Sequence, residues 1–113
     1  MTAYHVKSRI WIESGDKVLL GQGRVSLLKE IQETGSLSKA AKSLKMSYKK
    51  AWTLIDAVNK SAKEPVVMMS VGGVKGGGTE VTTYGKKLIA VFEEINSECW
   101  AFLEKQEEKI KNL

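Results

Sequence analysis

The chain of 113 residues has very few of the side chains that build disulfides, metal sites or catalytic sets. Its single cysteine, Cys99, excludes an intrachain disulfide and is typical of proteins from reducing compartments. Its one histidine, His5, has no cysteine or carboxylate cluster beside it, so we expect neither a metal site nor a cofactor. No nucleophile is paired with a base, and we therefore expect no enzymatic activity.

Long apolar runs are also missing. Residues 1–20 lack the apolar core of a signal peptide, and no segment approaches the length of a membrane span. We expect a cytoplasmic protein with no membrane partner. With 42% hydrophobic and 27% charged residues, the composition fits a single globular domain over residues 1–113.

Positive charge is concentrated in the first half of the chain. The net charge is +5, and residues 1–60 hold 11 Lys and Arg against 5 Asp and Glu. Residues 61–113 hold 7 against 8. A basic half favours a polyanionic partner, with double-stranded DNA as the first candidate.

Residues 35–56 are typical of a helix-turn-helix. A helix over about residues 24–34 ends at Gly35, and Ser36 can cap a helix over residues 37–44. Lys45 and Met46 form the turn, and Ser47 caps a recognition helix that reaches about residue 60. We expect its buried stripe to be Ala51, Trp52, Ile55 and Val58.

Short β elements flank these helices. Residues 4–12 and 18–20, separated by a turn at residues 13–16, predict an N-terminal hairpin within residues 1–20. Pro65 stops the recognition helix, and residues 66–70 and 79–82 predict two strands joined by a glycine-rich loop, a β-wing over residues 66–82. The sequence therefore predicts a mainly α fold with small β elements, the winged helix-turn-helix.

Residues 83–111 predict one long helix that serves for dimerisation. Apolar residues recur along it at steps of about three and four, and its outer face is acidic. Because so small a domain cannot bury this whole row of apolar residues, we expect a homodimer. Cys99 fits a dimer or core contact better than a redox switch. The predicted interface comprises Leu88, Phe92, Ile95, Cys99, Phe102, Leu103 and Ile110.

The DNA contacts are predicted at the two helix starts and in the wing. Lysine at these positions can reach phosphates or guanine acceptors, and a helix N-terminus can receive a phosphate. Each position also has a plainer interpretation, such as a capping serine, a solvated lysine face or a merely flexible wing loop around Lys75. The predicted contacts are Ser36, Ser38, Lys39, Ser47, Tyr48, Lys49, Lys50, Thr53 and Lys75.

These motifs together resemble the N-terminal DNA-binding domain of the ModE family of bacterial molybdate-responsive regulators. That domain is related to the LysR-type winged helices. The resemblance is carried by Thr34-Gly-Ser-Leu-Ser38 with Ala40-Ala41, by Met46-Ser-Tyr-Lys49 with Ala51-Trp52, by Gly72-Gly-Val-Lys-Gly-Gly-Gly78 and by Thr82-Thr-Tyr-Gly85. It implies a dimer joined through the long helix, with two recognition helices on two half-sites. Lys45 departs from the usual small residue in the turn.

A full ModE protein continues into molybdate-binding β-barrel domains, and this sequence stops at Leu113. We therefore carry molybdate sensing over to no residue and expect a stand-alone regulator of transcription. Two alternatives stay open. One is a protein-interaction adaptor, paired with a separate molybdate-binding partner protein, and the other is a non-specific, chromatin-like DNA-binding protein.

Overall fold

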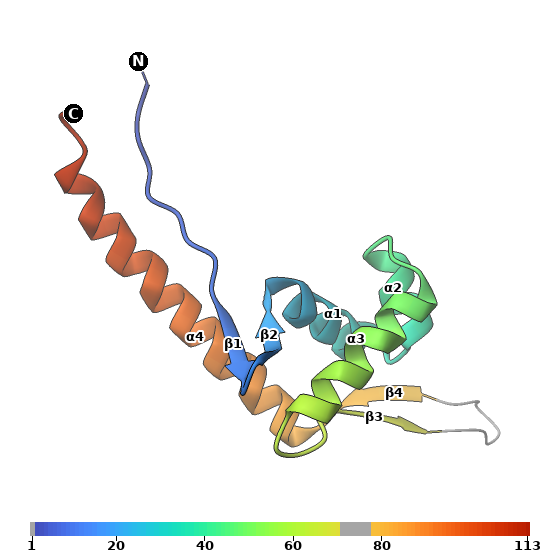
Figure 1. Ribbon diagram of the computed structural model, residues 1–113. Coiled ribbons are helices and arrows are strands. Elements are labelled where there is room, and N and C mark those ends of the chain that lie inside the picture. Colours follow the sequence, from blue (N-terminus) through green and yellow to red (C-terminus); the bar gives the residue numbers. More distant parts are fainter. Residues whose placement is uncertain (1, 71–77) are drawn as a thin grey trace.

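The computed structural model describes residues 2–70 and 78–113. Over these residues the fold is mainly helical with two antiparallel strand pairs, as predicted (Figure 1). The elements follow in the order β1 (Trp11–Ser14), β2 (Lys17–Gly21), α1 (Gln22–Thr34), α2 (Leu37–Ser43), α3 (Tyr48–Ser61), β3 (Val67–Ser70), β4 (Gly78–Val81) and α4 (Thr83–Gln106), followed by a 3₁₀ turn at Glu107–Lys109.

The centre of the fold is the packing of α1, α2 and α3. Buried apolar residues include Leu27, Leu28 and Ile31 of α1 and Ile55 and Val58 of α3. Burial of such side chains contributes roughly 1.5–3 kcal/mol each. The three helices therefore share one core, from which α2 and the first turns of α3 extend to the surface.

The helix boundaries follow local backbone chemistry. Gly35 ends α1 with φ of 67°, a conformation that glycine adopts without steric cost, and its N–H donates to the Ile31 carbonyl. Ser36 and Ser47 cap α2 and α3, accepting from the N–H groups of Lys39 and Lys50. These stop and cap predictions are confirmed.

Lys45 forms the turn between α2 and α3 in a left-handed conformation, with φ of 57°. Its N–H donates to the Lys42 carbonyl, and the next N–H, of Met46, donates to the Ala41 carbonyl. A left-handed lysine costs about 1–2 kcal/mol relative to the right-handed form. The turn nevertheless forms at this position without the usual small residue.

The N-terminal hairpin is shorter than predicted. Strand β1 starts at Trp11 rather than near residue 4 and pairs with β2 across the turn at Gly15 and Asp16. Residues 4–10 run in extended form beside α4, where the Val6 N–H donates to Glu107 Oε2 at 2.8 Å (Figure 1). Contact with α4, which no local pattern encodes, replaces the expected strand pairing.

Polar side chains attach the β3–β4 pair to the helices. Asn59 of α3 accepts from the N–H groups of Val66 and Val67 and donates to the Val67 carbonyl. On the other strand, the Thr79 N–H donates to the Gly35 carbonyl, while its hydroxyl accepts from the Leu37 N–H. The base of the predicted wing is thereby fixed against both ends of the helix-turn-helix.

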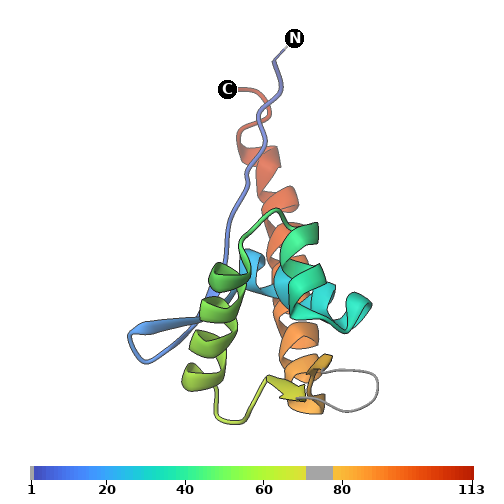
Figure 2. The same cartoon turned by 90° about the vertical axis from the view of Figure 1, so that its right-hand side faces the viewer.

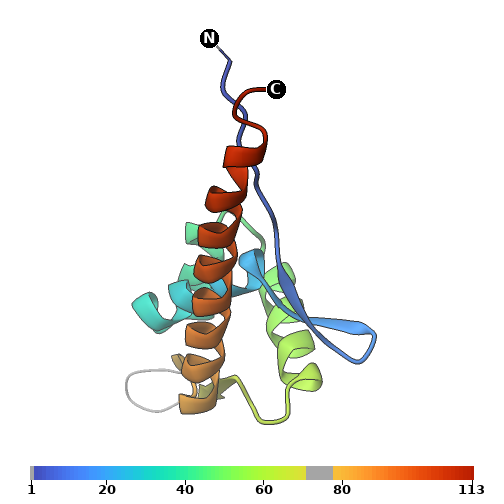
Figure 3. The same ribbon diagram turned by 90° about the vertical axis from the view of Figure 1, so that its left-hand side faces the viewer.

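Helix α4 ends at Gln106 rather than near residue 111, because the chain tightens into the 3₁₀ turn. With 24 residues it is about 36 Å long, and its second half extends beyond the core, which makes the molecule elongated (Figure 3). Among residues 2–70 and 78–113, no helix is both long and apolar enough to cross a membrane.

Gly85 is required where α4 packs on the strand pair. A Cβ at this position would lie 2.5 Å from the Val66 carbonyl oxygen and 2.7 Å from Val81 Cγ1. We predict that Gly85→Ala lowers the free energy of unfolding by about 1–3 kcal/mol, because the backbone must move apart. Urea unfolding measures the change.

Gly23→Ala is the matched control. Gly23 also lies in the first turn of a helix, α1, but a Cβ there has no atom within 4 Å. We expect stabilisation of roughly 0.5–1 kcal/mol from the higher helix propensity of alanine. Equal effects of the two substitutions would contradict the packing role of Gly85.

Candidate nucleic-acid interface

Helices α2 and α3 form one side of the molecule, and α4 lies on the opposite side. Figure 2 shows α2 and α3 facing the viewer, and the view from the other side has α4 in front (Figure 3). Six carboxylates of α4 and the following 3₁₀ turn therefore lie away from the α2–α3 surface: Glu93, Glu94, Glu98 and Glu104 on α4, and Glu107 and Glu108 in the turn.

The α2–α3 surface carries unopposed positive charge. Residues 34–55 contain five lysines and no Asp or Glu. All five are exposed, and none forms an ion pair within the described residues. We call them the lysine cluster: Lys39, Lys42, Lys45, Lys49 and Lys50. Such a surface attracts a polyanion and lacks the carboxylates that would repel one.

The structure brings most of the predicted contact residues to this surface. Ser38 and Lys39 are exposed on α2, and Tyr48, Lys49 and Lys50 are exposed on the first turn of α3. Thr53 is exposed one turn further, although its hydroxyl donates to the Lys49 carbonyl at 2.9 Å. The first turn of α3 thus presents one aromatic and two cationic side chains.

The capping serines have a structural role that leaves room for a ligand. Ser36 Oγ accepts from the Lys39 N–H at 3.1 Å, and Ser47 Oγ accepts from the Lys50 N–H at 3.0 Å. The remaining N–H groups of each first turn have no intrahelical acceptor. The Leu37 N–H of α2 instead donates to the Thr79 hydroxyl, and at the start of α3 an anion would be stabilised by the helix dipole.

The prediction that Trp52 belongs to the buried stripe of the recognition helix is wrong. Its side chain is 47% exposed, whereas Ala51, Ile55 and Val58 are buried. Trp52 is at the edge of this stripe, and the neighbouring helices cover the Ala51 side instead. Trp52 therefore adds an aromatic surface next to Lys49, one turn along α3.

The predicted contact at Lys75 lies outside the described residues. The described part of the predicted wing ends at Ser70 and resumes at Gly78, whose N–H donates to Ser70 Oγ at 3.2 Å. Two members of the lysine cluster, Lys42 and Lys45, were not among the predicted contacts. The absence of any carboxylate between Glu33 and Asp56 is the sequence signal that identifies them.

The second predicted surface, along α4, is partly corrected. Phe92 is only 1% exposed because it packs into the core of its own chain, so its side chain is not available to a partner. Ile95 and Phe102 are exposed by 46% and 60%, and Val91, which was not predicted, by 49%. With half-buried Leu88, these residues form what we call the α4 stripe: Leu88, Val91, Ile95 and Phe102.

The other predicted interface residues are less accessible. Cys99 is half-buried, and its sulfur lies 3.4 Å from the hydroxyl of Ser8 in the N-terminal segment. Leu103 is half-buried on α4, and Ile110 is half-buried beyond the helix end. The N-terminal segment thus covers part of the α4 surface that was predicted to contact a second copy of the chain.

Ser47 provides a test of how the start of α3 is held. We predict that Ser47→Ala lowers the free energy of unfolding by about 1 kcal/mol, because the Lys50 N–H loses its side-chain acceptor. Ser47→Asp keeps a capping oxygen and should retain the stability of the parent. Thermal and urea unfolding measure both.

Ser38→Ala is the control, since Ser38 is exposed within α2 and its hydroxyl forms no hydrogen bond with residues 2–70 or 78–113. Its stability should match the parent or exceed it slightly, because alanine has the higher helix propensity. If Ser47→Ala were as harmless as Ser38→Ala, the cap would not hold α3.

Comparison with known proteins places these features in a family context. No protein-family model matches the chain. The chain is 34% identical over all of its 113 residues to the molybdenum transport protein ModE of Azotobacter vinelandii, of which it covers 42%. It is 47% identical over 70 residues to the transcriptional regulator ModE of Haemophilus influenzae, covering 62% of this chain and 28% of that protein.

A third relative is the DNA-binding transcriptional dual regulator ModE of Escherichia coli, 39% identical over 77 residues, which cover 68% of this chain and 29% of that protein. The chain spans less than half the length of these relatives. The resemblance drawn from the sequence motifs is confirmed. The chain is a homologue of the ModE proteins and corresponds to their N-terminal region.

Proposed function

We propose that the protein is a transcription regulator that binds double-stranded DNA through the α2–α3 surface. The observation that carries the proposal is the lysine cluster, five exposed lysines on α2, the following turn and the first turn of α3, with no carboxylate in residues 34–55. Homology supports it, because a relative 39% identical over 77 residues is a DNA-binding regulator. Phosphate neutralisation by lysines supplies most of the affinity in such complexes.

The start of α3 is the part that reads sequence. An α-helix fits the major groove, and residues of its first turns reach base edges in helix-turn-helix proteins. Tyr48, Lys49 and Thr53 are exposed there, and Trp52 adds an apolar surface that suits a thymine methyl group. Ser36, Ser38 and Lys39 at the start of α2 face the DNA backbone in this arrangement. Lys75 remains a proposed wing contact.

The regulator acts as a homodimer through the α4 stripe. Three of its residues are large apolar side chains exposed by 46% or more, at steps of four and seven residues. Such a pattern faces a second helix in a coiled-coil-like contact. A dimer provides two recognition helices and therefore reads a pseudo-palindromic site whose half-sites are separated by one or more helical turns.

Selection of the genomic DNA fragments that the protein binds distinguishes this function from two others. Met69 on β3 is exposed and lines a shallow hollow together with Trp52, and this apolar patch favours a protein-interaction adaptor as the second candidate. Purified protein would be used to select genomic fragments at near-physiological salt. A two-fold symmetric motif supports the regulator, binding without a motif indicates a chromatin-like protein, and no binding indicates the adaptor.

The lysines of α3 can be tested directly. We predict that Lys49→Ala/Lys50→Ala raises the Kd for a selected DNA fragment roughly tenfold or more and makes the log–log salt slope shallower by about 1–2, since each phosphate contact contributes about 0.9. Both side chains are exposed, so stability should not change. Fluorescence anisotropy at several salt concentrations measures both effects.

Lys105→Ala/Lys109→Ala is the charge-matched control. Both lysines are exposed near the far end of α4, away from the α2–α3 surface. The control should bind DNA like the parent. If the Lys49 and Lys50 double variant bound DNA like the parent, the proposed interface would be contradicted. If both variants lost the same DNA affinity, the loss would reflect net charge and not a specific surface.

The dimer is tested on α4. We predict that Ile95→Glu/Phe102→Glu yields a monomer, because two carboxylates would be buried against a second copy. Sedimentation velocity measures the mass, with the parent expected at twice the chain mass of 12.5 kDa. DNA affinity should fall as well, since one recognition helix is lost from each complex.

Ser97→Glu/Ala101→Glu is the control on the same helix. Both residues are exposed, and helical spacing places them about 100–160° around the helix from Ile95 and Phe102. This variant carries the same added charge and should remain dimeric. A parent that is monomeric at tens of micromolar, or a dimer unaffected by the Ile95 and Phe102 changes, would overturn the proposed interface.

A further inference from the structure

A pocket lies between the N-terminal segment and α4, on the side of the molecule away from the recognition helix. Its volume is about 340 Å³, at the lower end of the roughly 300–1,000 Å³ typical of small-molecule sites. Residues from three separate parts of the chain line it: 7–10 of the N-terminal segment, Gln22 at the start of α1, and Phe92, Asn96 and Trp100 of α4.

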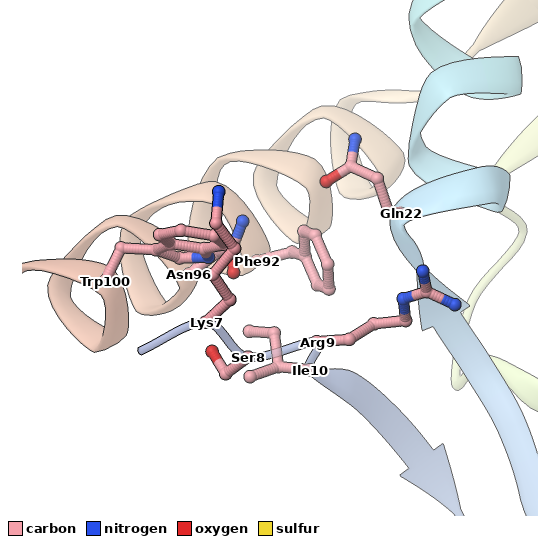
Figure 4. A pocket seen from close by; sticks show the side chains of 8 residues that line it. All are labelled: Lys7, Ser8, Arg9, Ile10, Gln22, Phe92, Asn96 and Trp100. Atoms are coloured by element: carbon pink, nitrogen blue, oxygen red, sulfur yellow. The ribbon is translucent and has the colours of Figure 1, made fainter. Parts of the chain in front are cut away.

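The pocket combines aromatic walls with cations at its two ends. Figure 4 shows Trp100 at one end, the ring of Phe92 behind the centre, and Gln22 and Arg9 at the other end. Lys7 rises beside Trp100, with its Nζ 5.5 Å from the ring centroid. A flat apolar group placed at the centre would have the nearly buried ring of Phe92 behind it and the more exposed ring of Trp100 at its end.

The charge of the lining is uncompensated. No carboxylate lines the pocket, and neither Lys7 nor Arg9 forms an ion pair within residues 2–70 and 78–113. The other polar groups of the lining include the side-chain amides of Gln22 and Asn96, whose NH₂ groups also donate hydrogen bonds. An anionic group at either end would receive charge-assisted hydrogen bonds.

We propose that this pocket binds a small organic anion with a flat apolar body, of the aromatic carboxylate class. The site is separate from the α2–α3 surface and from the α4 stripe. On α4, Phe92 and Asn96 each follow a stripe residue directly, which places the pocket face about 100° around the helix from the stripe. A ligand here would tie the N-terminal segment to α4 while both other surfaces stay accessible.

Benzoate and its uncharged counterpart benzamide are the probes. Binding is followed by NMR in the absence of DNA, through the indole N–H signals of the three tryptophans, with the Trp100 signal assigned from Trp100→Phe. Benzoate should shift the Trp100 signal saturably and leave those of Trp11 and Trp52 unchanged. Benzamide should bind roughly tenfold more weakly or worse, because it lacks the charge.

Lys7→Gln/Arg9→Gln should weaken benzoate binding by a similar factor. Both side chains are exposed, and an unchanged backbone spectrum verifies that the variant is folded. Lys63→Gln/Lys105→Gln, exposed and outside the pocket, removes the same charge and should bind benzoate like the parent. A loss that is equal in both variants would overturn the site in favour of general attraction by the basic protein.

Three further outcomes would contradict the proposed site. No saturable shift of Trp100 at millimolar benzoate overturns the proposal, including the case in which a second copy of the chain covers the pocket. Equal affinity for benzoate and benzamide excludes the role of the cations. A shift by sulfate equal to that by benzoate overturns the organic class, because the aromatic walls would then contribute nothing. None of these results depends on DNA binding.

Discussion

The close approach of α2 to α3 depends on three alanines, Ala40, Ala41 and Ala51, each at most 2% exposed. A larger side chain at any of them would separate the two helices, since interiors are packed without spare volume. The crossing fixes where both helix starts, capped by Ser36 and Ser47, reach the surface. The alanines occupy the buried positions of α2 and α3. The lysine cluster occupies exposed positions of the same helices and of the turn between them.

Hydrogen bonds then connect this helix pair to the rest of the fold. Asn59 holds the end of α3 against β3, and Thr79 ties β4 to the turn between α1 and α2. Thr82 caps α4 and also donates to the Pro65 carbonyl at 2.7 Å. Within the described residues no buried side-chain polar atom is left without a partner. The base of the predicted wing and the start of α4 therefore share one rigid frame with the recognition helix.

Separation of charge and apolar surface gives each side of the molecule a different chemistry. The α2–α3 side is cationic, and the far side presents α4 with its carboxylates and the α4 stripe. The N-terminal segment lies between these two sides, bonded to α4 through Val6 and Ser8. The far half of α4 extends beyond the core, which the dimensions of 63 × 31 × 22 Å reflect.

Local patterns in the sequence determined the elements themselves. Gly35, Ser36 and Ser47 act within a few residues of the backbone groups that they satisfy, so the ends of α1, α2 and α3 could be predicted to within two residues. Helical periodicity likewise identified α4, and strand-like runs bounded by turn residues identified the two short strand pairs. Motif spacing carried the resemblance to ModE, and the charge imbalance favoured a polyanionic partner for the first half of the chain.

Only the tertiary structure decided which face of each helix is covered. Trp52 and Phe92 both fit an apolar spacing, yet the neighbouring elements leave Trp52 exposed and bury Phe92, because a 3.6-residue period does not specify the partner. Residues 4–10 have strand-like composition but contact α4, over a hundred positions away at Val6 and Glu107. The pocket between the N-terminal segment and α4 is lined by three distant parts of the chain, so no local sequence pattern could predict it.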